Sequence, residues 1–223
     1  MLTPTYIFSD DFTSFETYFT QKEHVDRAYR KGDYLWTPDE PYSRIHYIRS
    51  GVTYNLLEHE SGHRKIISFH GKGTVFPGYH RMQYRIEKSL LTVAMSDVEA
   101  LEFTSEQFGN MFNENPELRM QVIDWFSSYT NLLLYETAHQ EYNSSFVKLC
   151  NLLYLLLVSN NGKQNDLGSI SQNTLADILG VSLVNLTRGL TRLRSEGVIK
   201  TSRQKIVVLN PDMLKYYCSY ETV

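Results

Sequence analysis

Hydrophobic side chains change their spacing along the chain, and each change predicts a different kind of structure. Near the start, Phe8, Phe12, Phe15, Tyr18 and Phe19 recur at three- and four-residue intervals. This spacing places them on one face of a helix, so we predict a short helical segment over residues 8–30.

From Lys31 onward, short runs rich in β-branched and aromatic residues alternate with Gly and Pro. Many short strands separated by glycine turns predict a β-sandwich or a small barrel. Residues 59–63 predict a hairpin turn, with Gly62 supplying the positive φ. The predicted strands cover residues 45–48, 52–57, 64–69, 90–95 and 98–103.

A long helix is predicted from Pro116 to about residue 140, with Asn115 as its cap and Glu117 in its first turn. We predict that a heptad seam along this helix is the interface of a homodimer, and a helix buried within one chain is the alternative. A second stripe, Ile123, Phe126 and Leu133, would let another face of the helix pack elsewhere. The seam consists of Leu118, Val122, Trp125, Tyr129, Leu132, Glu136 and His139.

The next segment changes character at Asn143 and Ser144, which predict the cap of a Leu-rich helix over residues 145–160. A polar loop is predicted over residues 161–168. We place a domain boundary near Asn143, which divides the chain into residues 1–142 and residues 143–223.

The C-terminal part predicts two helices joined by a tight turn. Ser171 is expected to cap the first helix, Gly180 to end it in the left-handed conformation, and Ser182 to cap the second. Short β-runs at 196–199 and 205–209 predict a hairpin wing, with a polar, basic connection over residues 200–204. This pattern indicates a winged helix-turn-helix. The inward residues of the two helices are Leu175, Ile178, Leu179, Leu186, Leu190 and Leu193.

Charge supports this division. Residues 1–142 carry 13 Lys and Arg against 20 Asp and Glu, whereas residues 143–223 carry 9 against 5. Within 170–209 the balance is +4, which suits contact with DNA phosphates. A winged helix used only for protein contact is the alternative.

Composition and motifs limit which other classes of protein the chain could belong to. The chain is 42% hydrophobic and 21% charged, as in folded proteins, and it has neither a long apolar run nor a secretory signal. We therefore expect no membrane partner and a cytoplasmic location. Cys150 and Cys218 are interpreted as inert buried thiols rather than redox sensors. His59 and His63 are interpreted as a solvated turn rather than metal ligands. Because no catalytic motif is present, we predict no enzyme activity, no metal and no cofactor.

Several short motifs stand in a fixed order: Lys31-Gly-Asp-Tyr-Leu, residues 45–52, His70-Gly-Lys-Gly73 and the Asn115-Pro116 helix start. The last is a pattern of Gln172, Ala176, Gly180, Ser182 and Arg188. Together they resemble the Crp/Fnr family of bacterial transcription regulators over nearly the whole chain. The resemblance implies an α+β fold: an N-terminal β-roll (double-stranded β-helix or jelly roll), a long dimerisation helix and a C-terminal winged helix-turn-helix. It also implies a homodimer on a palindromic DNA site, with RNA polymerase as a candidate further partner.

Departures from the family pattern bear on the effector. Members that bind cyclic AMP carry a glutamate where this chain has Gly78, and an arginine where it has Lys88. We therefore predict a different effector, a small anionic or aromatic molecule. The alternative is a solvated basic loop with structural tyrosines. The predicted effector-binding residues are Tyr79, Arg81, Tyr84, Arg85, Lys88, Ser89, Tyr129 and Leu133.

Base contacts of the family map onto Leu183, Val184, Thr187 and Arg188. Apolar side chains read thymine methyl groups and arginine grips guanine, so we predict a half-site with T steps and one G. The start of the first helix is expected to contact DNA phosphates, through Ser171, Gln172 and Asn173. Two further residues are also predicted to contact DNA, Ser182 and Arg192. The competing hypothesis is a ligand-binding or protein-interaction module whose winged helix no longer reads DNA.

Overall fold

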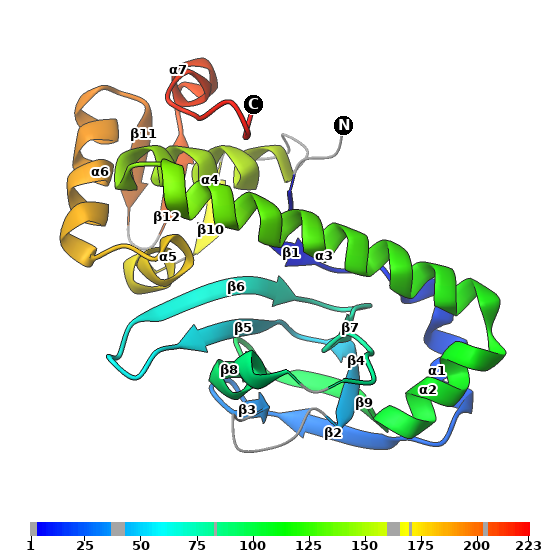
Figure 1. The fold of residues 1–223 in the computed structure, drawn as a ribbon. Coiled ribbons are helices and arrows are strands. Elements are labelled where there is room, and N and C mark those ends of the chain that lie inside the picture. The colour runs from blue at the N-terminus through cyan, green and yellow to red at the C-terminus, as the bar shows by residue number, and fades with distance from the viewer. Residues whose placement is uncertain (1–3, 37–42, 83, 160–165, 170, 203–204) are drawn as a thin grey trace. The chain divides into compact units, whose positions relative to one another are not determined.

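The computed structural model describes residues 4–36, 43–82, 84–159, 166–169, 171–202 and 205–223 (Figure 1). The chain divides into two compact units. Residues 6–130 form the first, and residues 131–223 form most of the second. No helix in the described part of the chain is long and apolar enough to cross a membrane.

The first unit is the predicted β-roll, which consists of two sheets (Figure 1). One has the order β1-β6-β5-β8-β3 and the other the order β2-β9-β4-β7. All five predicted strands are confirmed, because they coincide with β4, β5, β6, β8 and β9. The strands are β1 (Ile7–Phe8), β2 (Val25–Tyr29), β3 (Tyr34–Trp36), β4 (Arg44–Ser50), β5 (Thr53–Glu58), β6 (Arg64–His70), β7 (Val75–Phe76), β8 (Leu90–Ala94) and β9 (Val98–Thr104).

The N-terminal helix prediction is only partly right. Residues 8–30 contain β1, a 3-10 turn (Thr13–Phe15), the short α1 (Glu16–Gln21) and strand β2. Phe12, Phe15 and Phe19 are buried, as their spacing predicted. Strand β2 was missed because it is largely exposed and pairs antiparallel with β9, so it carries no hydrophobic alternation of its own.

Side-chain caps fix the next helices. Thr104 accepts a hydrogen bond from the Gln107 backbone and begins α2 (Ser105–Glu114). The Asn115 side chain then accepts from the backbone N–H groups of Glu117 and Leu118, at 3.0 and 3.1 Å. This cap begins α3 (Pro116–Tyr142), the predicted long helix.

The second unit contains the predicted winged helix-turn-helix. Ser171 caps α5 (Gln172–Leu179), Gly180 ends it at φ 61°, and Ser182 caps α6 (Leu183–Ser195). Helix α6 packs closely on α4 (Ser145–Ser159), because a Cβ at Gly189 would come within 2.9 Å of the Leu149 side chain. The predicted inward leucines of α5 and α6 are buried. Helix α7 (Pro211–Tyr216) follows the wing.

The wing differs from the prediction in two ways. Its first strand, β11 (Ile199–Ser202), begins three residues later than expected because Gly197, at φ 71°, extends the turn after α6. A third strand, β10 (Asp166–Ser169), pairs with β12 (Lys205–Val208) inside the segment predicted as a polar loop. The assignment of functional domains at Asn143 stays a prediction.

Two glycine turns of the roll provide a matched test of packing. Gly51 and Gly62 both have positive φ, but only at Gly51 would a Cβ meet a backbone oxygen, that of Asp97, at 2.1 Å. Gly62→Ala should therefore cost about 1 kcal/mol of unfolding free energy, from the left-handed backbone alone. Gly51→Ala should cost at least about 2 kcal/mol more, through steric overlap. Urea denaturation of both variants measures the difference, and equal losses would contradict the assigned packing.

Candidate DNA interface and effector site

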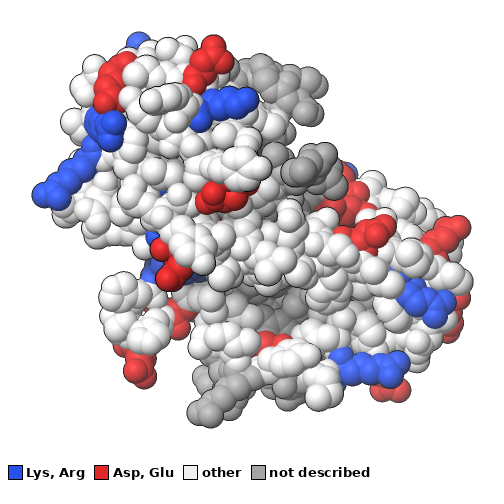
Figure 2. Space-filling model, turned by 45° about the horizontal axis from the view of Figure 1, so that its top comes forward, with Lys and Arg blue, Asp and Glu red and all other residues white. Residues whose placement is uncertain are grey.

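The outer face of α6 exposes the residues predicted to contact bases. Leu183 and Val184 are 47% and 60% exposed, and Thr187 and Arg188 are exposed beside them. Within the described residues the Arg188 guanidinium has no hydrogen-bond or ionic partner. Figure 2 shows Lys and Arg side chains projecting at the left of the view, the side on which Figure 1 draws α6. This face can therefore present one free cation and two apolar side chains together.

Arg192, one helical turn beyond Arg188, and Arg194 are already engaged by partners within the second unit. The Arg192 guanidinium donates to Glu196 at 2.9 Å and stacks over the Phe146 ring at 4.0 Å from its centre. Arg194 donates to Thr191 and to Thr201 of the wing. These contacts hold α6 against Phe146 of α4 and against the wing. The DNA contact predicted for Arg192 would therefore compete with its contacts to Glu196 and Phe146.

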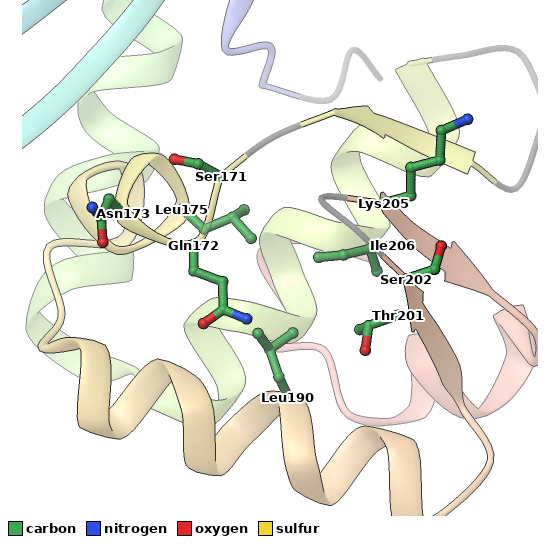
Figure 3. A pocket seen from close by; sticks show the side chains of 9 residues that line it. All are labelled: Ser171, Gln172, Asn173, Leu175, Leu190, Thr201, Ser202, Lys205 and Ile206. Carbon is green, nitrogen blue, oxygen red and sulfur yellow. The ribbon is translucent and has the colours of Figure 1, made fainter.

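A polar pocket of about 330 Å³ lies between the start of α5, the middle of α6 and the wing (Figure 3). Leu175, Leu190 and Ile206 supply its apolar wall. Figure 3 shows the Gln172 side chain extending towards Leu190, whereas Lys205 extends away from the pocket. The Ser171 hydroxyl caps the helix by accepting from the Thr174 backbone at 3.0 Å. The other lining residues are Asn173, Thr201 and Ser202.

The predicted dimer seam lies inside the single chain. Leu118, Val122 and Trp125 are buried in the first unit, and Leu132, Glu136 and His139 are buried in the second. Heptad spacing identifies the packed face of a helix but not its partner, and here the same chain supplies the packing. The large hydrophobic side chains that α3 leaves exposed are Met120, Ile123, Leu133, Leu134 and, at its last residue, Tyr142.

The C-terminal end of α3 is hydrogen-bonded to several other elements of the second unit. Gln140 accepts from Lys148 of α4 at 2.8 Å and donates to the Leu179 carbonyl at the end of α5 at 3.3 Å. The Tyr135 hydroxyl shares a hydrogen bond of 3.0 Å with Thr222 in the C-terminal tail. These contacts hold α3, α4, α5 and the tail together.

The predicted effector residues are dispersed. Tyr79 packs against Phe108 and Phe112, and Arg81 and Tyr84 are exposed. The side chains of Arg85 and Lys88 lie outside the described part of the structure. Ser89 is half-buried and Leu133 is exposed. Among the described side chains of the set, Tyr129 makes a hydrogen bond to a buried polar residue, since its hydroxyl accepts from Asn55 at 3.4 Å.

Sequence reasoning missed a row of polar residues on the inner face of the roll. Asn55 pairs in register with Ser68 on one side and Thr92 on the other, and His70 lies two residues beyond Ser68. All four are buried. A polar residue within an otherwise apolar strand, such as Asn55 between Tyr54 and Leu56, was the available signal.

His70 is the most enclosed member of this row. Burial lowers its pKa to about 3, so the imidazole is neutral at physiological pH. Its Nε2 lies 2.9 Å from the Ser68 hydroxyl. Its ring stacks on Phe8 and lies against the tilted ring of Phe76, with ring centres 3.9 Å apart. The inner face therefore presents neutral hydrogen-bonding groups among aromatic rings.

The opposite sheet carries a buried charge. Glu102 lies 3.1 Å from His46 Nε2 and accepts from Arg27 at 2.8 Å. The hydrogen bond with His46 and that from Arg27 lower the Glu102 pKa to about 2.

The two cysteines are poor candidates for a reactive site. Burial raises the pKa values of Cys150 and Cys218 to about 12, so both thiols stay protonated. The described residues contain no cluster of three or more metal-ligating side chains.

Gly78 has no room for the glutamate that cyclic-AMP-binding members of the Crp/Fnr family carry at this position. A Cβ at Gly78 would come within 2.5 Å of the Phe126 ring and 2.9 Å of the Trp125 ring, so a larger residue requires these side chains to move.

A β-roll, a long helix and a winged helix-turn-helix in this order define a transcription regulator with an effector-binding domain. The chain matches the cyclic nucleotide-binding domain over residues 26–115 and the Crp-like helix-turn-helix domain over residues 147–217. It belongs to the Crp/Fnr family.

Individual relatives agree with this assignment. The Global nitrogen regulator of Synechocystis sp. is 25% identical, covering 84% of this chain and 85% of that protein. The transcriptional activator protein anr of Pseudomonas aeruginosa is 21% identical, over 82% and 76%. These relatives are regulators, not enzymes.

Solved structures show the same fold. A mutant of CooA from Carboxydothermus hydrogenoformans has a TM-score of 0.77 at 17% identity, covering 91% of this chain and 90% of that one. A CprK structure complexed with OCPA has a TM-score of 0.75 at 17% identity, over 97% and 99%.

The Glu102 cluster makes stability depend on pH in a defined window. Because its folded pKa lies below the ordinary value of 4.5, Glu102 stabilises the fold above that pH, and this contribution disappears as pH falls through about 2. Its size is about 2 kcal/mol. Glu102→Gln should flatten the loss of stability between pH 4.5 and 2, measured by urea unfolding across that range. Glu99→Gln, an exposed change on the same strand, is the control and should leave the profile unchanged.

Proposed function

We propose that the protein is an effector-responsive transcription regulator that binds a two-fold symmetric DNA site as a homodimer. Residues 1–142 would sense the effector and residues 143–223 would bind DNA. The observation that carries the proposal is the outer face of α6, where Arg188 has no described partner beside exposed Leu183 and Val184. In a winged helix-turn-helix this face enters the major groove, where arginine reads guanine and apolar side chains meet thymine methyl groups.

Backbone contacts would come from the rim of the polar pocket. The first turn of α5, at Gln172 and Asn173, provides backbone N–H groups, and the wing adds the Thr201 and Ser202 hydroxyls (Figure 3). Such groups suit a DNA phosphate and fix the position of the protein without reading sequence. Lys200 on the exposed wing adds a further cation.

Arg188→Ala and Lys200→Ala test this division of roles. Arg188→Ala should cost about 1–3 kcal/mol at the preferred site and relax the preference at one base. Lys200→Ala should weaken binding similarly on all sequences and reduce the salt dependence by about one phosphate contact. Selection from random DNA, followed by titrations at several salt concentrations, measures both effects. A wild-type selection with no fixed G in the half-site would refute the base contact.

Dimerisation is proposed through the exposed stripe of α3, with a second copy of the chain as its partner. Met120, Ile123 and Leu134 are 57%, 47% and 67% exposed, and heptad spacing links them through Ser127 and Thr130. An apolar stripe at this spacing fits a parallel helix pair. A palindromic DNA site requires such a pair.

The double variant Ile123→Asp/Leu134→Asp should convert the dimer to a monomer, because two charges would have to be buried at the helix pair. Sedimentation velocity over a range of concentrations measures the change. Val25→Asp, at a comparably exposed apolar position on β2, is the control and should leave the dimer intact. A wild-type chain that sediments as a monomer at every concentration would contradict the proposal.

The effector is proposed to be a small anionic or aromatic molecule rather than cyclic AMP. Support comes from the aromatic rings and neutral polar groups inside the roll, and from Gly78 at the glutamate position. A similarly folded CprK structure is described in complex with o-chlorophenolacetic acid, an aromatic acid. Arg81, Arg85 and Lys88 remain proposed contacts for an anionic group. Effector binding would shift the population of DNA-binding conformations.

The alternative, a module that no longer reads DNA, is favoured by apolar Leu183 and Val184 on the recognition face. Salt-dependent retention on duplex DNA separates the two hypotheses. Retention that weakens with salt supports the regulator, and no retention at any salt concentration, with or without small aromatic acids, supports the module. Contact with RNA polymerase stays a prediction.

A further inference from the structure

The ring of Phe8 occupies an aromatic cage inside the first unit, formed by His70, Trp125 and Tyr129. Phe8 is almost fully buried, with its ring centre 5.7 Å from that of His70 and 5.6 Å from those of Trp125 and Tyr129. Trp125 and Tyr129 stack on each other at 5.2 Å with nearly parallel planes. The chain therefore places a benzene ring of its own between β6 and α3.

This hydrocarbon ring leaves polar atoms of its cage unpaired. His70 Nδ1 and Trp125 Nε1 are both buried and have no hydrogen-bond partner among the described residues. The two ring centres are 6.2 Å apart, about two hydrogen-bond lengths, which is a separation that one bridging oxygen atom fits. Whichever tautomer His70 adopts, a hydroxyl group can pair with Nδ1, since it both donates and accepts, and it can accept from the Trp125 N–H.

The segment that carries Phe8 is short. Strand β1 has two residues, paired in parallel with Phe69 and His70 at the end of β6. The hydrogen bonds that flank Phe8 run from Phe69 N–H to the Tyr6 carbonyl and from Gly71 N–H to the Phe8 carbonyl. Ile7 between them is 46% exposed. Local opening of this two-residue edge element would break both of these backbone hydrogen bonds.

The cage also selects against charge. His70 is neutral, and its cage partners are an indole and a phenol ring. An anionic group placed against them would lose its hydration without gaining a cation. A hydroxyl group suits this environment better than a carboxylate.

We propose that Phe8 is a built-in competitor for the effector, and that the cage takes a neutral single-ring aromatic molecule bearing a hydroxyl group. Such a phenol-class ligand displaces the Phe8 ring, stacks in its place and bonds His70 and Trp125 through its hydroxyl. This inference rests on the proposed effector function of the roll and specifies the chemical class that the roll accepts.

Calorimetric titration of the full-length chain with phenol, benzene and benzoate tests the class. Phe8→Ala removes the competitor, so it should bind phenol about tenfold more tightly than the unmodified protein does, a difference of about 1.4 kcal/mol. In the same variant phenol should bind at least about tenfold more tightly than benzene or benzoate. Adding His70→Leu to Phe8→Ala should reduce phenol affinity to that of benzene. Phe12→Ala, at a buried ring outside the cage, is the control for lost packing and should leave phenol affinity unchanged.

Hydrogen exchange on the unmodified protein tests displacement without any variant, which covers the case in which Phe8→Ala does not fold. Saturating phenol should increase exchange of the Phe69 and Gly71 amides, because their acceptors on the Phe8 segment leave. Benzene binding as tightly as phenol in Phe8→Ala, or phenol binding that leaves these amides protected, would overturn the proposal. No phenol binding to either protein would also overturn it. DNA retention without phenol, measured in parallel, shows whether the regulator hypothesis itself has failed.

Discussion

The close packing of the first half of α3 against the β-roll is the contact on which the rest of the sensing unit depends. Leu118, Val122 and Trp125 bury one face of the helix. Gly78 lets the roll approach so closely that a methyl group would overlap Phe126. Interiors packed at this density shift between discrete arrangements rather than deforming smoothly. A ligand of the proposed kind beneath Trp125 would have to displace side chains packed between the roll and α3, such as the Phe8 ring.

Helix α3 is a single continuous element that begins against the roll and ends in the second unit. The two ends of the protein have opposite chemistry. The roll interior offers neutral donors and acceptors among aromatic rings, whereas α6 offers a free guanidinium beside apolar side chains. The proposed small-molecule sensing and groove reading would use separate residues, so that either could change without loss of the other.

Local signals predicted the second unit well. Ser171, Gly180 and Ser182 act through the backbone next to them, so their capping roles could be read from sequence. The strands of the roll were also predictable from composition and glycine punctuation. The sequence did not predict the role of side chains whose packing partners lie far away in the sequence. The spacing of Leu118, Val122 and Trp125 identified a packed face, but only the fold shows that the same chain covers it. Asn55 and Thr92 become neighbours through strand pairing that no local pattern specifies.

The hydrogen bonds of Gln140 have a consequence for how the protein unfolds. Because Gln140 joins α3 to α4 and α5, and Tyr135 joins α3 to the tail, the last turns of α3 share their stability with the winged helix. The first turns share theirs with the roll. The division between the two compact units therefore falls inside an unbroken helix, near Asn131. Local opening of α3 at that point would separate the two units while the core of each stays folded.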